Sequence, residues 1–131
     1  MNKHHVILGP KRSPKVDLAK KIASDFRNSQ VFWSDARRFI SKNTHPFSHI
    51  DASIQVKLII LDNIGYAIPD YKLKELVTGE LIVNKPNQKE FTISPQYILI
   101  FDEEVHPKWL DPSVFRRFII HDLFLKPPIA N

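Results

Sequence analysis

The sequence predicts a single α/β domain of three layers, in which helices flank a mostly parallel sheet. Three observations predict this fold class. Short aliphatic runs recur along the chain, helical patterns separate them, and several runs end at a glycine or a carboxylate. Strands that alternate with helices favour a parallel sheet that is covered on both faces. The 131 residues fit one domain, 1–131, with one hydrophobic core.

The amino-terminal elements alternate between strand and helix. The predicted order is a strand, a helix, a strand, a short helical piece and a loop, at residues 5–9, 17–26, 31–33, 36–40 and 41–49. The helix is predicted because Leu18, Ile22 and Phe26 recur every four residues and form one apolar face.

The remaining elements follow from aliphatic runs and turn signals. Residues 57–62 (KLIILD) form the clearest buried strand, and a helix at 71–77 precedes Gly79, which suits a helix C-terminus. Residues 80–84 and 90–93 flank Lys-Pro-Asn-Gln-Lys, which predicts a hairpin. A strand at 97–101, a helical piece around Ser113, a strand at 118–120 and a proline-rich tail complete the chain.

Composition restricts the classes of function. The chain contains no cysteine, which excludes disulfides, zinc–thiolate sites and a cysteine nucleophile. The first apolar stretch is too short for a signal peptide or a membrane span, so we expect a cytoplasmic protein without a membrane partner. A net charge of +5 favours nucleic acid as a partner.

Three strand ends carry residues suited to ligand binding. Gly9, Asp62 and Asp102 each follow a predicted strand. Ligands of parallel sheets bind at the carboxyl ends of the strands, so we expect these residues to converge on one edge.

The segment after the first strand has the spacing of a phosphate-binding loop, Gly-x4-Gly-Lys-Ser/Thr. Gly9 and Lys15 match this pattern, whereas Pro14 replaces the second glycine and Val16 replaces the hydroxyl residue. The strand KLIILD has the form of a Walker B strand that delivers Asp62.

The order of motifs along the chain resembles that of the superfamily 3 helicases, which are AAA+-related P-loop NTPases of small viruses and mobile elements. Their pattern is a helix ending in Thr-Gly, a hairpin with lysines, an apolar strand with a polar end, a Pro/Trp segment and paired arginines. Here these are Thr78-Gly79, residues 85–89, residues 97–102, residues 106–109 and Arg116-Arg117. The resemblance covers nearly the whole chain and implies a P-loop NTPase-like fold.

The resemblance also implies roles and ligands. Gly9, Ser13 and Lys15 correspond to the nucleotide-binding loop, with Lys15 facing the phosphates of ATP. Asp62 corresponds to the residue that holds Mg²⁺. In addition, Lys85 and Lys89 would contact single-stranded nucleic acid, and Arg116 or Arg117 would serve as an arginine finger in an oligomer.

The sequence departs from this family at positions that take part in ATP hydrolysis. Pro14 lacks a backbone N–H, and Val16 cannot bind Mg²⁺. Asn63 replaces the acidic residue that activates water, and Asp102 brings a negative charge towards the phosphate position. We therefore expect ATP hydrolysis to be lost, and we assign neither ATP nor Mg²⁺ as a cofactor.

Simpler interpretations of the same residues remain open. Lys15 could be a solvated lysine, Asp62 could cap a turn with Asn63 and Gly65, and the paired arginines could bind nearby carboxylates. Trp33 and Trp109 are expected to serve packing rather than base stacking. His4 and His5 are expected to face solvent, and no metal site is predicted at 102–106 or elsewhere.

These observations predict a catalytically degenerate, ATPase-like and helicase-like module that binds nucleic acid or a protein partner. One alternative is a divergent ATPase that is active as a homo-oligomer. Another is a structural or regulatory subunit of an ATPase assembly.

Overall fold

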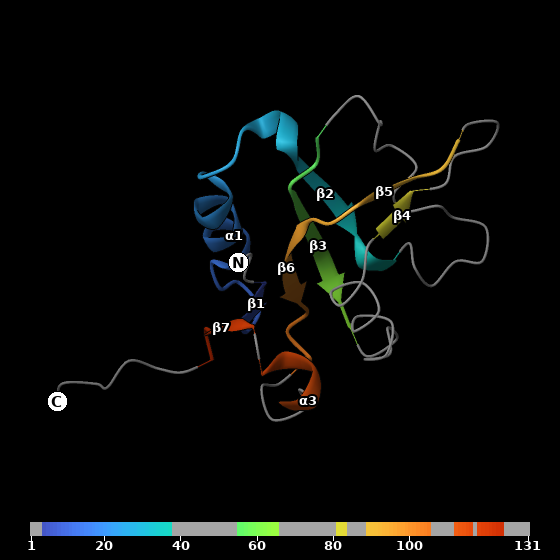
Figure 1. Ribbon diagram of the computed structural model, residues 1–131. Coiled ribbons are helices and arrows are strands. Elements are labelled where there is room, and N and C mark those ends of the chain that lie inside the picture. Colours follow the sequence, from blue (N-terminus) through green and yellow to red (C-terminus); the bar gives the residue numbers. More distant parts are fainter. Residues whose placement is uncertain are drawn as a thin grey trace, which may run out of the picture.

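The computed structural model of the protein describes residues 4–37, 55–65, 81–83, 89–105, 112–116 and 118–124. Five strands form a sheet in the order β2-β3-β6-β1-β7, and every neighbouring pair is parallel. Figure 1 shows the sheet with α1 beside it. The strands are β1 (His5–Leu8), β2 (Val31–Asp35), β3 (Leu58–Ile64), β6 (Gln96–Phe101) and β7 (Ile119–Asp122).

The central strands form because their aliphatic residues are buried on both faces of the sheet. Val6, Ile7 and Leu8 in β1 are fully buried, and the same holds for the four residues 58–61 in β3. Continuous apolar runs of this kind are typical of parallel sheets covered on two sides. The α/β class and the mostly parallel sheet predicted from the sequence are therefore confirmed.

Helix α1 (Lys15–Ala23) covers one face of the sheet. Leu18 and Ile22 pack there against buried aliphatic residues of β1, β3 and β6. The helix begins two residues earlier and ends three residues earlier than predicted. It ends because the Ser24 N–H and hydroxyl both donate to the Lys21 carbonyl, at 3.3 and 2.6 Å, in place of continued α-helical bonding.

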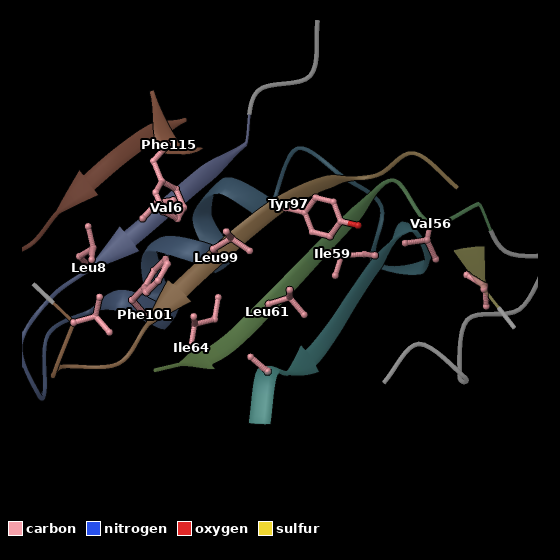
Figure 2. Close-up of a cluster of buried hydrophobic side chains, with 13 residues drawn as sticks. Val6, Leu8, Val56, Ile59, Leu61, Ile64, Tyr97, Leu99, Phe101 and Phe115 are labelled. Atoms are coloured by element: carbon pink, nitrogen blue, oxygen red, sulfur yellow. The ribbon is translucent and has the colours of Figure 1, made fainter. Parts of the chain in front are cut away.

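The opposite face is covered by α3 (Pro112–Phe115) and by a separate hairpin, β4 (Leu81–Val83) and β5 (Phe91–Ile93). Strands β4 and β5 are antiparallel, as the sequence predicted. Phe115 and Val83 join the hydrophobic cluster on this face, and Phe91 and Ile93 pack against it. Figure 2 shows this cluster, with Phe115 over Val6.

Three strands continue two residues beyond their predicted ends: β2 to Asp35, β3 to Ile64 and β7 to Asp122. β3 continues through Asp62 to Ile64, and its register against β6 shifts between Leu61 and Ile64. The bulge places Asn63 in the left-handed backbone region, at φ 62°. β7 begins at Ile119 and continues to Asp122, because its pairing with β1 extends to Leu8.

Several predicted elements lie outside the described residues. They are the helix at 71–77 with Gly79, the loop at 41–49, the hairpin turn at 84–88 and the tail at 126–131. Among the helices that the structure describes, none has the length and apolar character that crossing a membrane requires.

Candidate functional site

The carboxyl ends of β1, β3 and β6 border a hollow of about 520 Å³, which we call the carboxyl-edge hollow. Its lining comes from three segments: residues 11–17, Asp62 with Asn63, and residues 100–104. The structure thus brings Asp62 and Asp102 together with the loop that follows Gly9. This was expected because each of these residues lies at the end of a predicted strand.

The order of the strands explains this position. The chain leaves β1 towards β2 on one side of the sheet, whereas it leaves β6 towards β7 on the other side. β1 and β6 are neighbours, and their outgoing connections run in opposite directions, each past the other strand. The connection with α1 lies on one face of the sheet and the connection with α3 lies on the other face. Ligands of open α/β sheets bind at such switch points.

The loop between β1 and α1 is closed by its own hydrogen bonds. The Ser13 N–H and hydroxyl donate to the Pro10 carbonyl at 3.1 and 2.6 Å, and the Lys15 N–H donates to the Ser13 carbonyl at 2.8 Å. Pro14, at φ −80° and ψ 49°, forms a turn close to an inverse γ-turn. Arg12 takes a left-handed conformation at φ 67°. The N–H groups of Ser13 and Lys15 therefore both donate to carbonyls of the same loop.

Lys15 is held by the main chain. Its ammonium group donates to the Gly9 carbonyl at 3.0 Å and to the Phe101 carbonyl at 3.2 Å. These carbonyls lie at the carboxyl ends of β1 and β6, so the half-buried side chain bridges neighbouring strands. The simpler interpretation of Lys15 as a solvated lysine is therefore wrong.

Asp62 and Asn63 form a local hydrogen-bonded unit on β3. The Asn63 N–H donates to Asp62 Oδ1 at 2.7 Å, at the bulge of β3. The Asn63 amide group also donates to Asp35 Oδ2 at 3.2 Å. Asn63 therefore binds a carboxylate on the neighbouring strand β2.

Asp35 and Arg37 belong to this edge, although the sequence reasoning did not identify them. Arg37 Nε donates to both carboxylate oxygens of Asp35 at 3.0 Å, and Arg37 Nη2 donates to Oδ2 as well. Hydrogen bonding from Arg37 lowers the pKa of Asp35 to about 2. A carboxylate at a strand end with an arginine two residues later is the signal that could have revealed this pair.

Asp102 follows directly after β6 and lines the hollow. Burial, and then the charge of Glu104, raise the pKa of its carboxyl, while Lys15 opposes the shift. A Cβ atom on Gly65 would lie 2.6 Å from Glu104 Oε1 and 3.2 Å from Asp102 Oδ2. The glycine therefore allows both carboxylates to approach the end of β3.

Other predicted site residues lie elsewhere. Arg116 is exposed at the end of α3 and does not line the hollow, and within the described chain it forms no ion pair. Lys89 is exposed just before β5, whereas Lys85 and Arg117 lie outside the described residues. Across the described ranges, no three His, Asp or Glu side chains are grouped so that they could hold a metal ion.

The amino-terminal histidines do not face solvent as predicted. His5 Nδ1 and His121 Nε2 lie 2.9 Å apart, and the two rings stack across β1 and β7. His4 Nδ1 accepts a hydrogen bond from the Tyr97 N–H at 3.0 Å. Both histidines are half-buried because β1 is flanked by two strands.

Trp33 also departs from its predicted packing role. It lies on the edge strand β2, and 40% of its surface is exposed. The edge position explains this exposure, since β3 covers only one side of β2. Trp109 lies outside the described residues.

No family model matches the chain, and no curated protein matches it. The fold is similar to solved structures of the NrS-1 C-terminal region. "The apo structure of NrS-1 C terminal region (305-718)" has a TM-score of 0.63 and 18% identity over 92% of this chain. "The A form apo structure of NrS-1 C terminal region-CTR" has a TM-score of 0.60 and 18% identity over 93%.

A third structure, "The A form apo structure of NrS-1 C terminal region-CTR(305-718)", has a TM-score of 0.60 and 16% identity over 98% of this chain. This chain spans only 29–31% of the length of the three structures. At these identities the similarity concerns the fold.

Proposed function

We propose that this chain is a catalytically degenerate, ATPase-like and helicase-like module that acts by binding nucleic acid or a protein partner. The observation that carries the proposal is the closed loop at the carboxyl end of β1. There, Lys15 donates to two main-chain carbonyls, and the N–H groups of Ser13 and Lys15 donate within the loop.

A phosphate-binding loop needs free N–H groups that point at the anion. In this loop Pro14 has no N–H, and the N–H groups of Ser13 and Lys15 already have partners. The Ser13 hydroxyl donates to the Pro10 carbonyl and lies 2.6 Å from where a Cβ of Gly9 would stand. A nucleotide would have to break these bonds before the loop could surround its phosphates.

The groups that would serve Mg²⁺ and water are also altered. Val16, in the first turn of α1, offers an exposed apolar side chain in place of a hydroxyl. The Asn63 amide group donates a hydrogen bond to Asp35, and an amide cannot accept a proton as a carboxylate does. The residues present therefore do not fit Mg²⁺-ATP, and we derive no hydrolytic step.

The charge around the hollow supports the same conclusion. Four carboxylates line it together with the loop: Asp62, Asp102, Glu103 and Glu104. A polyphosphate placed between them and Lys15 would meet several carboxylates at short range, and like charges in a partly buried site repel strongly. The hollow is better suited to a ligand that carries fewer negative charges than ATP.

The observation that favours the active-ATPase alternative is the position of Lys15 and Asp62 at the same hollow. Calorimetric titration with ATP, with and without Mg²⁺, separates the two hypotheses. We expect no binding and no hydrolysis that single-stranded DNA stimulates. Mg²⁺-dependent binding that Lys15→Ala abolishes would contradict the proposal.

A gain-of-function variant makes this test sharper. The double substitution Pro14→Gly with Val16→Thr restores the full loop pattern, including one N–H group and one hydroxyl. We expect it to bind ATP measurably where the natural chain does not. Pro14→Ala with Val16→Ala is the matched control: it also restores the N–H group at position 14, but it supplies neither the glycine nor the hydroxyl of the motif.

A further inference from the structure

Trp33 borders a hollow on the α1 face of the sheet. Side chains alternate along a strand, so Trp33 shares its face with Val31, which packs against the cluster under α1. The hollow measures about 470 Å³, within the usual range of ligand sites. We call it the Trp33 hollow; it is lined by Lys20, Ala23, Ser24, Asn28, Val31 and Trp33.

The hollow joins an exposed aromatic ring to a cationic segment. Lys20 lines it directly, and Lys21 and Arg27 are exposed in the same stretch of chain, against the single anion Asp25. Ser24 and Asn28 add polar side chains to the lining. A negatively charged ligand is therefore favoured on this side of Trp33.

The other side of Trp33 has the opposite charge. A smaller hollow of about 260 Å³ lies there, lined by Trp33, Ser34, Asp35, Asp62 and Asn63. Asp35 is in an ion pair with Arg37, so Asp62, which is in no ion pair among the described residues, supplies the negative charge on this side. A phosphate chain would be repelled from this carboxylate side and attracted towards Lys20.

We propose that the Trp33 hollow binds single-stranded nucleic acid, with one base stacked on Trp33 and the neighbouring phosphate near Lys20. This inference rests on the proposed binding function and gives it a ligand class and a site. An aromatic platform beside a cationic groove is how proteins bind single strands without sequence preference. A duplex would not suit the site, because its bases are already stacked on one another.

The site differs from the hairpin that carries Lys89. The hairpin residues Val83, Phe91 and Ile93 belong with the cluster on the sheet face opposite α1, whereas Trp33 lies on the α1 face. Substitutions at the two places therefore separate the two candidate surfaces.

The first test measures the binding of a fluorescently labelled oligothymidylate of 15 nucleotides by fluorescence anisotropy at low salt. We expect Trp33→Leu to weaken binding about 5- to 100-fold, the range for loss of one stacked base. Ile120→Ala is the matched control, because Ile120 is an exposed apolar residue on β7, the other edge strand, with 46% of its surface exposed. Unchanged binding by Trp33→Leu would overturn the inference.

A charge pair tests the phosphate contact. Lys20→Glu and Lys21→Glu change the net charge equally, but only Lys20 lines the hollow. We expect the Lys20 variant to bind the oligonucleotide at least several-fold more weakly than the Lys21 variant. Equal losses would indicate a diffuse charge effect and contradict the site. If circular dichroism shows that Trp33→Leu does not fold, this pair of lysine variants tests the binding site in its place.

A spectroscopic test reports stacking directly. The Trp109→Phe variant leaves Trp33 as the only tryptophan, since the chain has two. We expect oligothymidylate to quench the Trp33 fluorescence, and inorganic polyphosphate, which has charge without bases, to leave it unchanged. Equal quenching by both polyanions, or stronger quenching by a blunt duplex, would contradict base stacking.

The outcomes also distinguish this inference from the proposed function. If the oligonucleotide binds and only the pair Lys85→Glu with Lys89→Glu weakens it, the binding function stands at the hairpin and the Trp33 site is wrong. If the oligonucleotide does not bind at all, the inference fails, while the loss of ATP binding and hydrolysis is judged by its own titration.

Discussion

At the scale of a single residue, the buried hydroxyl of Tyr97 lowers the stability of the folded chain. Only 1% of Tyr97 is exposed, and its ring lies in the cluster near Ile59 (Figure 2). Its hydroxyl is buried and has no hydrogen-bond partner among the described residues, and burial raises the pKa of Tyr97. A buried hydroxyl without a partner costs about 1–3 kcal/mol in protein substitution data.

We therefore expect Tyr97→Phe to increase the free energy of unfolding by about 1 kcal/mol, because the ring stays and the unsatisfied hydroxyl is removed. Urea denaturation measures the change. Tyr97→Ala is the contrasting variant and should lose about 3–5 kcal/mol through the cavity it leaves. A Phe variant that is less stable than the natural chain would mean that the hydroxyl has a partner.

At the scale of an element, the loop between β1 and α1 depends on a close approach at Gly9. A Cβ atom there would lie 2.6 Å from Ser13 Oγ and 2.9 Å from the Cβ of Leu123. Leu123 follows β7, and its N–H donates to the Leu8 carbonyl at 2.8 Å. Gly9 thus lets the loop close against the end of a neighbouring strand.

Gly9→Ala should lower the free energy of unfolding by about 1–3 kcal/mol, the usual cost of overpacking a buried position. Urea denaturation again measures it. The matched control is Gly65→Ala, whose nearest obstacle is the end of the exposed Glu104 side chain, which can move. An equal loss in both variants would show that close packing at Gly9 is not the cause.

At the scale of the whole molecule, β7 is joined to the sheet only through β1. The pair His5 and His121 lies on these two strands, with ring nitrogens 2.9 Å apart. Burial lowers the pKa of both, and the charges of His121 and His4 lower that of His5 further. The neutral pair therefore belongs to the folded state.

The sign of the pH dependence follows from linkage. The unfolded chain binds protons on these histidines near pH 6.5, whereas the folded chain needs a lower pH. The free energy of unfolding should therefore be highest above pH 6.5 and should fall as the pH drops through this range. Urea denaturation at pH 7.5 and 5.5 checks it. His5→Gln with His121→Gln should reduce the fall, and an unchanged fall would assign it to other groups.

The sequence alone predicted most of the sheet and the edge at which the candidate site lies. Aliphatic runs such as residues 58–61 can be satisfied only by burial on both faces, and the spacing of Leu18 and Ile22 suits only a helix with one apolar face. Because strand ends of a parallel sheet meet at one edge, Gly9, Asp62 and Asp102 could be placed together before the structure was known.

Only the tertiary structure decided how these parts meet. The bonds of Lys15 to the Phe101 carbonyl and of Asn63 to Asp35, and the contact of His5 with His121, join residues that are far apart in the chain. The exposure of Trp33 depends on β2 being an edge strand, which local patterns do not encode. Local periodicity determines which segments become strands and helices, whereas the order of the strands determines which side chains become neighbours and which remain open to a ligand.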